Sequence, residues 1–244
     1  GDVLFLRTLN ERQEFKITVP KCFEEYFSSW KVCESLLRID KKGRAFFLFV
    51  FSKEFDANAS VNPKVIGLDL GINKLVVASD RQFFRSSVVK SVRNRFVYLR
   101  SRLQAKGTRA AKRLLKRLSG RETRFMAWHN HNVSKQLVSS LSSGDVLVME
   151  ELKGIRRNIG RRNNRWLHSW SFGQLQQFIT YKAKRKGVVV VGVPARGTSK
   201  TCHRCGATDA SRHSGFFQCG SCGLHFDADL NAAYNIARLY RHYW

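Results

Sequence analysis

The sequence predicts an α/β protein that carries a small metal-binding module near its C-terminal end. Apolar runs at 65–70 and 146–149 have the length and composition of buried strands, and stretches with helical spacing lie between them. Four cysteines follow in two C-x-x-C pairs. Residues 1–62 alternate as strands do, which adds a β-rich segment in front of the α/β part.

Length and charge limit the classes of function. The chain has 244 residues, 43% of them hydrophobic, enough for one large or two small cores. Its 44 Lys and Arg against 18 Asp and Glu give a net charge of +26, which favours a polyanionic partner. No amphipathic anchor is evident and no apolar run could span a bilayer, so we expect a cytoplasmic protein that binds nucleic acid and no membrane. A ribosomal type of structural binder has the same charge balance.

The first 62 residues are expected to form a partial β-barrel. A helix from Lys21 to Trp30 follows Pro20, and a polar linker runs from Asp56 to Pro63. Cys22 and Cys33 have no metal spacing and are expected in the core. The expected strands are Val3 to Leu6, Phe15 to Val19, Cys33 to Ile39 and Ala45 to Ser52. The chain begins at Gly1 in what reads as a strand, so we expect a processed chain or a piece of a longer one.

The strand at 65–70 carries one acid, Asp69, among apolar residues and glycines. In an extended chain Gly67, Asp69 and Gly71 share a face, so no side chain flanks the carboxylate on its own strand. Such space suits a hydrated divalent cation and the approach of a phosphodiester backbone. An edge strand with a solvated Asp explains the same pattern. A second strand, Lys74 to Ser79, is expected to pair with it as a hairpin.

Glu150 stands at the C-terminal end of a second buried strand, Val146 to Met149. Open α/β sheets place their sites at this edge, which makes Glu150 a candidate. Glu151 follows directly and faces the other way. A terminal Glu that merely meets water is the alternative. Another buried strand, Val188 to Val193, follows an amphipathic helix from Phe172 to Lys186.

Two long tracts contain no acid and are expected to contact nucleic acid. Helical spacing from Val88 to Leu118, broken at Gly107-Thr108, predicts two antiparallel helices, and Glu122 to Leu141 predicts a further one. Unpaired cations repel one another unless phosphates neutralise them, although a solvated face is the alternative. The candidates in this tract are Arg93, Arg100, Arg109, Lys112, Arg113 and Lys116.

The second tract, Lys153 to Trp170, reads as a mobile loop in which cations alternate with Trp166, His168 and Trp170. That composition suits single-stranded nucleic acid. The candidates in this loop are Arg156, Arg157, Arg161, Arg162 and Arg165.

The two C-x-x-C pairs predict a structural zinc site. They supply four thiolates, and Gly206 and Gly223 allow a tight turn after each pair. A redox pair is the alternative, but it needs only one copy. Zinc held by four thiolates has no open position, so this module is expected to fold locally and to do no chemistry. The ligands are Cys202, Cys205, Cys219 and Cys222, and the nearby His203, His213 and His225 are expected at the surface.

A helix begins after this module, with Asp227 at its N-cap and Asp229 in its first turn. Capping alone explains both acids. The small residues beside them predict that the helix approaches a sheet closely.

Five motifs together resemble those of the TnpB family, transposon-encoded proteins that are similar to compact Cas12 effectors. They agree with that family in order and approximate distance, from about Leu36 to Ala237. The motifs are GLDLG at 67–71, VMEEL at 148–152, TSKTCHRCG at 198–206, CGSCG at 219–223 and DADLNAAYNIA at 227–237.

The resemblance implies a RuvC-like nuclease of the ribonuclease H fold with an inserted zinc ribbon. It implies an enzyme that binds a guide RNA from the transposon end and cuts target DNA beside a short adjacent motif, in a prokaryotic cytoplasm and associated with the nucleoid. The three catalytic carboxylates implied are Asp69, Glu150 and Asp229, with Asp227 as the fallback for the third, holding two Mg²⁺ ions. The implied domains are a wedge-like segment at 1–62, a nuclease domain at 63–199 and 224–244, and the ribbon at 200–223.

Family members usually begin with a longer segment that includes a helical recognition insertion, of which this chain is expected to contain at most the later part. Two other functions share the sequence features. A guided or non-specific nucleic-acid-binding protein or repressor would leave the nuclease site unused. A stand-alone junction resolvase would need neither a guide nor the ribbon.

Overall fold

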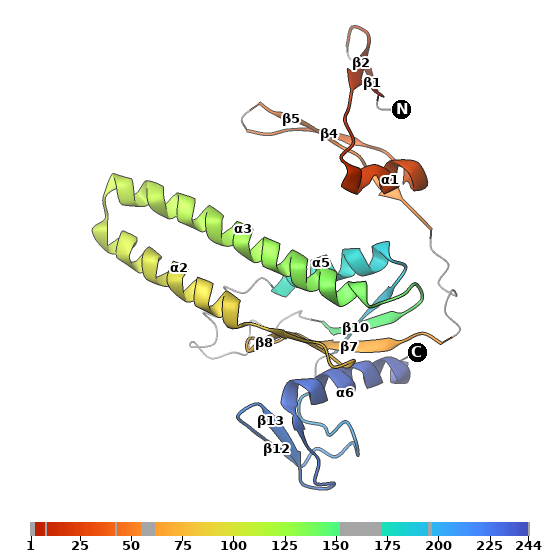
Figure 1. Ribbon diagram of the computed structural model, residues 1–244, viewed down its shortest axis with the longest axis vertical. Helices are drawn as coiled ribbons and strands as arrows, with labels where there is room; N and C mark the ends of the chain where they lie inside the picture. The colour runs from red at the N-terminus through yellow and green to blue at the C-terminus, as the bar shows by residue number, and fades with distance from the viewer. Residues whose placement is uncertain are drawn as a thin grey trace. The chain divides into compact units, whose positions relative to one another are not determined.

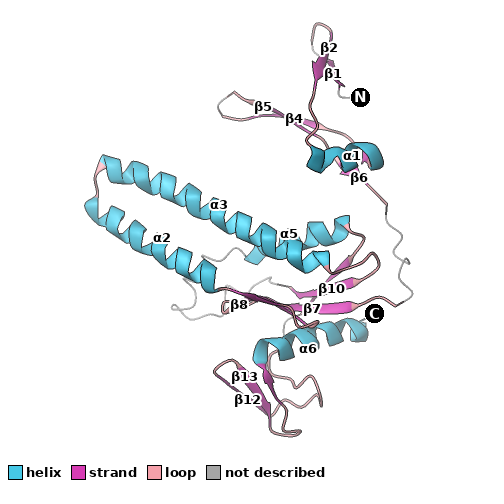
Figure 2. Cartoon of the chain, in the orientation of Figure 1, coloured by secondary structure: helices cyan, strands magenta, loops and turns pink. Residues whose placement is uncertain are grey.

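The computed structural model describes residues 3–7, 9–41, 43–54, 62–151, 172–194 and 197–243. The chain divides into two compact units, residues 1–55 and 56–244 (Figures 1 and 2). The linker expected at 56–63 and the basic loop expected at 153–170 lie almost wholly outside the described residues. None of the described helices combines the length and the apolar composition that a bilayer crossing requires.

The first unit consists of short hairpin-like ladders and one small helix. Pro20 precedes a single 3-10 turn and α1 (Glu24–Ser29), where one helix from Lys21 to Trp30 was expected. A partial barrel is not formed by the described strands, because they pair two by two and no ladder continues into the next. Cys22 is exposed and Cys33 half-buried, so the prediction that both lie in a core was wrong. The three ladders are β1 (Val3–Arg7) with β2 (Arg12–Lys16), β3 (Lys31–Val32) with β6 (Phe51–Ser52), and β4 (Leu36–Ile39) with β5 (Ala45–Leu48).

The second unit is built on a mixed five-stranded sheet in the order β11-β10-β7-β8-β9. Three strands are parallel: β7 (Val65–Asp69), β10 (Val146–Glu150) and β11 (Val189–Val193). The antiparallel β8 (Lys74–Ala78) and β9 (Phe83–Arg85) extend the sheet beyond β7. The carboxyl ends of β7 and β10 therefore meet at one edge.

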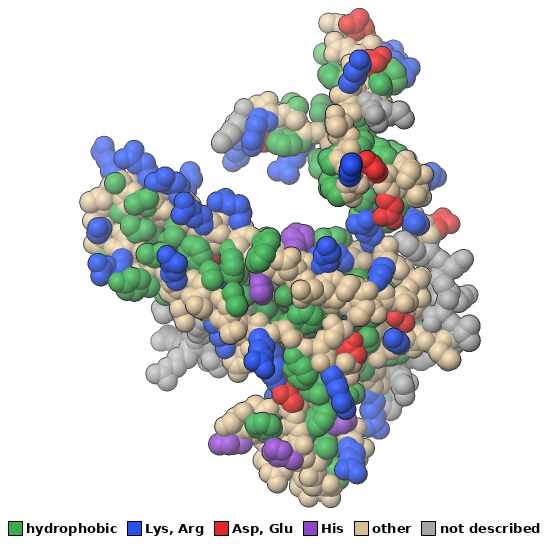
Figure 3. Space-filling view, viewed as in Figure 1, with side chains coloured by type: hydrophobic (Ala, Val, Ile, Leu, Met, Phe, Trp, Pro, Cys, Tyr) green, Lys and Arg blue, Asp and Glu red, His purple; other side chains and the backbone are tan. Residues whose placement is uncertain are grey.

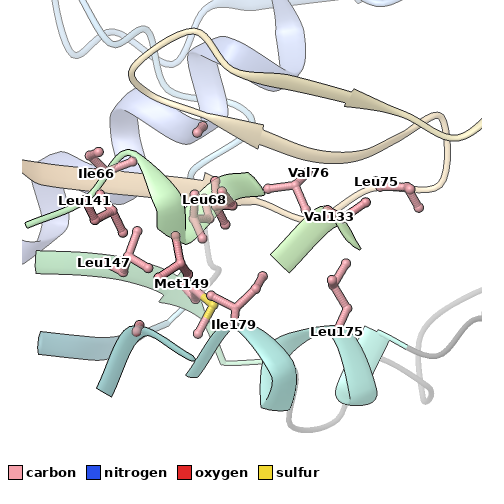
Figure 4. Close-up of a cluster of buried hydrophobic side chains, with 14 of the residues drawn as sticks. Ile66, Leu68, Leu75, Val76, Val133, Leu141, Leu147, Met149, Leu175 and Ile179 are labelled. Carbon is pink, nitrogen blue, oxygen red and sulfur yellow. The ribbon is translucent and has the colours of Figure 1, made fainter. Parts of the chain in front are cut away.

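Helices α2, α3 and α5 cover one face of this sheet (Figure 1). Leu68 of β7 and Leu147 of β10 are fully buried there in one cluster with Leu137 of α3 and Ile179 of α5. Figure 4 labels Leu68, Leu147 and Ile179. Along β7 and β10 the residues that alternate with these leucines point to the opposite face, as the two-residue period of a strand requires. The helices are α2 (Ser87–Lys106), α3 (Arg109–Ser139) and α5 (Phe172–Arg185).

Two predictions about these elements were wrong. Helix α3 runs without a break through Ser119-Gly120, where two helices were expected, because one helical glycine costs only about 1 kcal/mol and packing on α2 offsets it. Strand β11 lies at the edge of the sheet and is only partly buried, although its apolar sequence predicted burial on both faces. The expected break at Gly107 is confirmed, since Gly107 adopts a φ of 63° between α2 and α3.

Helix α6 (Ala228–Tyr243) covers the other face of the sheet and packs directly on β7. A Cβ placed on Gly67 would lie 2.2 Å from the carbonyl oxygen of Ala233 and 2.4 Å from the nitrogen of Ala237. The sequence interpretation of Gly67 as open space for a phosphodiester was therefore wrong. The glycine admits the backbone of α6 instead.

The segment that carries the four cysteines, called the cysteine module below, packs against α6. Its three-stranded sheet consists of β12 (Ala210–His213), β13 (Phe216–Cys219) and β14 (His225–Asp227), and β14 leads straight into the helix. Phe217 is fully buried beside Cys202 and Cys219 in a small core of its own. The module therefore forms a separate apolar cluster attached to the sheet through α6.

Candidate functional site: three carboxylates and four thiols

Asp69 and Glu150 end two neighbouring parallel strands. Leu68 pairs with Met149 in the register of β7 and β10, so Asp69 and Glu150 are the next residues along, on strands about 5 Å apart. Leu68 and Met149 face the α3 and α5 layer, which places both acids on the opposite face, that of α6. The sheet therefore presents two carboxylates side by side at its carboxyl edge.

The third acid, Asp229, is supplied by the first turn of α6. The pKa of Asp69 is raised from 3.8 to about 7. Burial is the largest cause, and repulsion from the charges of Glu150 and Asp229 follows. Lys74 and Arg212 oppose the shift. The charges of two acids that are far away in sequence thus act on Asp69 and add to the effect of its burial.

Asp227 has a different environment from Asp229. Its Oδ1 accepts hydrogen bonds from the backbone nitrogens of Asp229 (3.1 Å) and Leu230 (3.0 Å), which is the N-cap predicted from sequence. Its Oδ2 accepts a hydrogen bond from Lys74 at 2.5 Å. Asp227 is thus occupied in starting the helix, whereas Asp229 is the acid whose charge reaches Asp69.

Lys74 of β8 and Arg212 of β12 are cations at this acidic site that the sequence did not reveal. Lys74 Nζ lies 3.1 Å from Asp229 Oδ2, and an Arg212 guanidinium nitrogen lies 3.6 Å from Asp229 Oδ1. Desolvation lowers the pKa of Lys74, but its hydrogen bonds to Asp227 and Asp229 outweigh it and raise the pKa overall. Lys74 therefore stays an ammonium beside the acids.

Glu150 is held in place by two polar neighbours. The hydroxyl of Thr198 donates to Glu150 Oε1 at 2.7 Å, and Gln176 Nε2 of α5 donates to the Glu150 carbonyl at 2.9 Å. Desolvation raises the pKa of Glu150, and the Thr198 hydrogen bond partly offsets this. The carboxylate is therefore oriented by a hydroxyl group and forms no ion pair with the described residues.

The four cysteines predicted as ligands converge on one point. Their sulfurs all lie within 4.8 Å of one another, with Cys202 and Cys222 at 3.7 Å and Cys205 and Cys219 at 3.6 Å. Burial raises the pKa of the Cys202 thiol, but backbone N–H groups of Cys205 and Arg204 outweigh it and lower the pKa to about 7. The cluster can hold a metal ion. His213 and His225 are exposed, and His203 is half-buried.

Two buried asparagines of α6 attach the first C-x-x-C pair to the helix. Asn231 Nδ2 donates to the Thr201 carbonyl at 2.9 Å, while its Oδ1 accepts from the backbone nitrogen of His203 at 3.0 Å. Asn235 Nδ2 donates to the carbonyls of Thr198 (2.8 Å) and Thr201 (2.6 Å). These residues fix the cysteine module, and Thr198 with it, relative to Asp229 and Glu150.

The basic helices divide into paired and free cations. Arg93 is only 4% exposed and lies 4.0 Å from Glu122, which also accepts a hydrogen bond from Arg100 at 2.5 Å. Arg93 is thus withdrawn from any ligand and joins α2 to α3, so its prediction as a nucleic-acid contact was wrong. Figure 3 shows Lys and Arg side chains gathered along this hairpin. Four candidates are exposed and have no carboxylate partner among the described residues: Arg109, Lys112, Arg113 and Lys116.

The other five arginine candidates, in the loop 153–170, lie outside the described residues.

Comparison with known proteins shows which family this chain resembles. A model described as "Cas12f1-like, TNB domain" matches residues 172–236. A TnpB-like protein of Methanocaldococcus jannaschii is 34% identical over 155 residues, which cover 61% of this chain and 56% of that protein. The chain is similar to proteins of the TnpB/Cas12f family. The CRISPR-associated endodeoxyribonuclease Cas12f1 of Sulfoacidibacillus thermotolerans is 29% identical over 222 residues, covering 83% of this chain and 52% of that enzyme.

Solved structures show the same fold. A Cas12f1 chain, determined by cryo-electron microscopy in a complex with sgRNA and target DNA, aligns with a TM-score of 0.60 and 19% identity over 85% of this chain and 64% of that chain. The chain spans about half the length of the curated relatives it matches.

Proposed function

We propose that this protein is a metal-dependent DNA endonuclease with a RuvC-type site, guided by an RNA that derives from the transposon. The proposal is supported by the position of Asp69 and Glu150 at the ends of two neighbouring parallel strands, and by the charges of Glu150 and Asp229, which together with burial raise the pKa of Asp69 to about 7. A cluster that resists ionisation in this way gains free energy when divalent cations replace the missing positive charge. Relatives with nuclease names support the same reading.

The donor set fits Mg²⁺. All three side chains offer hard carboxylate oxygens, and the only cations at the site among the described residues are Lys74 and Arg212, which both contact Asp229. Among the described residues neither cation forms an ion pair with Asp69 or Glu150, although both lower the pKa of Asp69. When bound, two such ions would activate a water molecule and stabilise the departing 3′ oxygen of a phosphodiester.

The chain's own residues have distinct parts in this proposal. Asp69 and Glu150 would bind the ions from the rigid sheet edge, and Asp229 would close the site from α6. Thr198 orients the Glu150 carboxylate through its hydrogen bond. Arg212, 41% exposed on the cysteine module, is placed to reach a phosphate oxygen near Asp229.

The cysteine module is proposed to bind one structural Zn²⁺. A tetrahedral ion with Zn–S bonds of about 2.3 Å requires sulfurs about 3.8 Å apart, and the two measured pairs are 3.6 and 3.7 Å apart. Four thiolates leave no position for a substrate, so the ion would support folding alone. The proposed domains are a nuclease domain at 63–199 and 224–244, the ribbon at 200–223 and a wedge-like segment at 1–62, and the ribbon's sheet takes its third strand, β14, from the start of the 224–244 segment.

The test is guided cleavage of a plasmid. RNA that copurifies with the protein is sequenced, and a supercoiled plasmid carrying the matching target beside a randomised flank is incubated with protein, RNA and Mg²⁺. We expect nicked or linear product from the wild type, and at least a hundredfold less from Asp69→Ala or Glu150→Gln. Glu151→Gln is the matched control, since Glu151 is exposed and faces away from the acids, and should cut as the wild type does.

The same experiment separates the alternative function. If wild type and Asp69→Ala are equally inert on a target that they demonstrably bind, the protein is a guided or non-specific nucleic-acid-binding protein or repressor. Cleavage that needs no RNA and prefers branched DNA would indicate a stand-alone resolvase instead.

A further inference from the structure

A pocket of about 940 Å³ lies at the end of the sheet opposite to the acids. Its walls come from the start of β7 (63–66), the end of β8 (79–80), the end of α3 and the second half of α6. The first C-x-x-C pair closes it with His203 and Arg204. On α6, Tyr234 lies five residues and Arg238 nine residues after Asp229, which places them roughly 8 and 14 Å along the helix axis from that acid.

The charge of this pocket is strongly positive. Lys64, Arg204 and Arg238 line it and are all exposed, and none has a carboxylate partner among the described residues. The only acid in the lining, Asp80, accepts hydrogen bonds from the side chain (2.6 Å) and backbone (3.3 Å) of Gln82. Three cations against one carboxylate leave the lining with a net positive charge, which favours an anionic ligand.

The pocket also offers a rigid aromatic surface. The ring of Tyr234 stacks on that of His203 at 4.9 Å with an interplanar angle of 21°, and Phe226 supports His203 from 4.8 Å. Asn231 fixes the His203 ring, since its Oδ1 lies 2.9 Å from Nδ1 and its own Nδ2 is engaged with Thr201. Nδ1 therefore carries the proton and donates to Asn231. Stacked rings beside cations are the composition that binds a nucleotide.

We propose that this pocket binds one nucleotide of a nucleic-acid strand, with its phosphate at Arg204 and Arg238 and its base against Tyr234. A phosphate alone would use the arginines and leave the aromatic surface bare, whereas a nucleotide satisfies both. RNA and DNA offer this same unit. The inference rests on the proposed function only in taking a nucleic acid as the ligand, and it does not depend on cleavage.

Photo-crosslinking of the full chain tests the site directly. A 20-nucleotide single-stranded RNA containing 4-thiouridine and a DNA of the same sequence containing 4-thiothymidine are irradiated with the protein, and the crosslinked residue is mapped by mass spectrometry. We expect a crosslink at Tyr234 or His203. A crosslink with the RNA alone, the DNA alone or both supports the site and identifies its strand.

Charge variants separate this pocket from general attraction. Arg204→Gln with Arg238→Gln should abolish the crosslink, weaken binding about tenfold and lower the slope of log affinity against log salt by about two. The matched control is Lys135→Gln with Lys184→Gln, which removes two exposed charges from α3 and α5 and should leave the crosslink in place. Circular dichroism and metal content verify that each variant is folded.

A crosslink that maps only to other residues, or one that persists in the Arg204 and Arg238 double variant, overturns the proposal. A protein that crosslinks here but does not cut would refute the proposed nuclease and keep this site. Cleavage without a crosslink in this pocket would refute the nucleotide site and keep the proposed nuclease.

Discussion

Replacing Asp69 with Asn should remove a stability penalty that grows with pH. Burial first, and then repulsion from Glu150 and Asp229, raises the pKa of Asp69 from 3.8 to about 7. Between those values the unfolded chain has released this proton and the folded chain still holds it, so the folded state becomes less stable as pH rises. At about 1.4 kcal/mol for each pH unit of difference, the penalty is about 2 kcal/mol at pH 5 and about 4 kcal/mol above pH 7.

Because Asp69 is partly exposed, solvent screening should reduce these values by roughly half. Asn has nearly the same shape and does not titrate. The difference in free energy of unfolding between Asp69→Asn and the wild type should therefore increase by about 1 kcal/mol from pH 5 to pH 8.

The assay is urea unfolding followed by circular dichroism, in buffer without Mg²⁺ and with the cysteine site loaded. Millimolar Mg²⁺ should then stabilise the wild type at pH 8 more than the variant, since the ions bind the folded state alone. Glu151→Gln is the control, and the difference in free energy of unfolding between this variant and the wild type should not increase with pH. A difference for Asp69→Asn that stays constant from pH 5 to pH 8, or an equal growth in the control, would refute the clustering of charge at Asp69.

Three further outcomes follow from the packing. Gly67→Ala should lower the free energy of unfolding in urea by about 3 kcal/mol, because its Cβ would lie 2.2 Å from a backbone oxygen of α6. Gly173→Ala is the control and should be neutral or slightly stabilising, because its Cβ would have nothing within 4 Å. Asn235→Ala should lower the free energy of unfolding by about 2 kcal/mol in the same measurement and loosen metal retention, since the Thr198 carbonyl loses this donor and the Thr201 carbonyl keeps only that of Asn231. Cys219→Ser should reduce bound zinc from about one per chain to near zero by elemental analysis, and unchanged zinc would contradict the four-thiol site.

Local signals account for what the sequence predicted well. The end of an apolar strand, the spacing of two C-x-x-C pairs and the N-cap at Asp227 are each written within a few consecutive residues. The break at Gly107 belongs to the same group, because a left-handed residue with a following Thr cap stops one helix and starts another. Thr108 Oγ1 indeed accepts from the nitrogen of Ala111 at 3.2 Å.

Long-range contacts account for what the sequence did not predict. Lys74 and Asp227 are 153 residues apart, and no local sequence pattern around either residue predicts their hydrogen bond. Arg93 reads as one more cation on a basic helix, and only the position of Glu122 on α3 shows that it is buried. Gly67 was misread for the same reason: a missing side chain is compatible with a ligand or with a helix, and only the location of α6 decides.

Helix α6 explains why an acidic site and a cysteine module belong to one structure. Its first turn supplies Asp229, its middle binds the first C-x-x-C pair through Asn231 and Asn235, and its small residues press on β7. Thr198, held by Asn235, in turn orients Glu150. The hydrogen bonds that attach the module to α6 also determine the orientation of Glu150 on the sheet and of Asp229 on the helix. The module therefore need not touch a substrate to influence these acids.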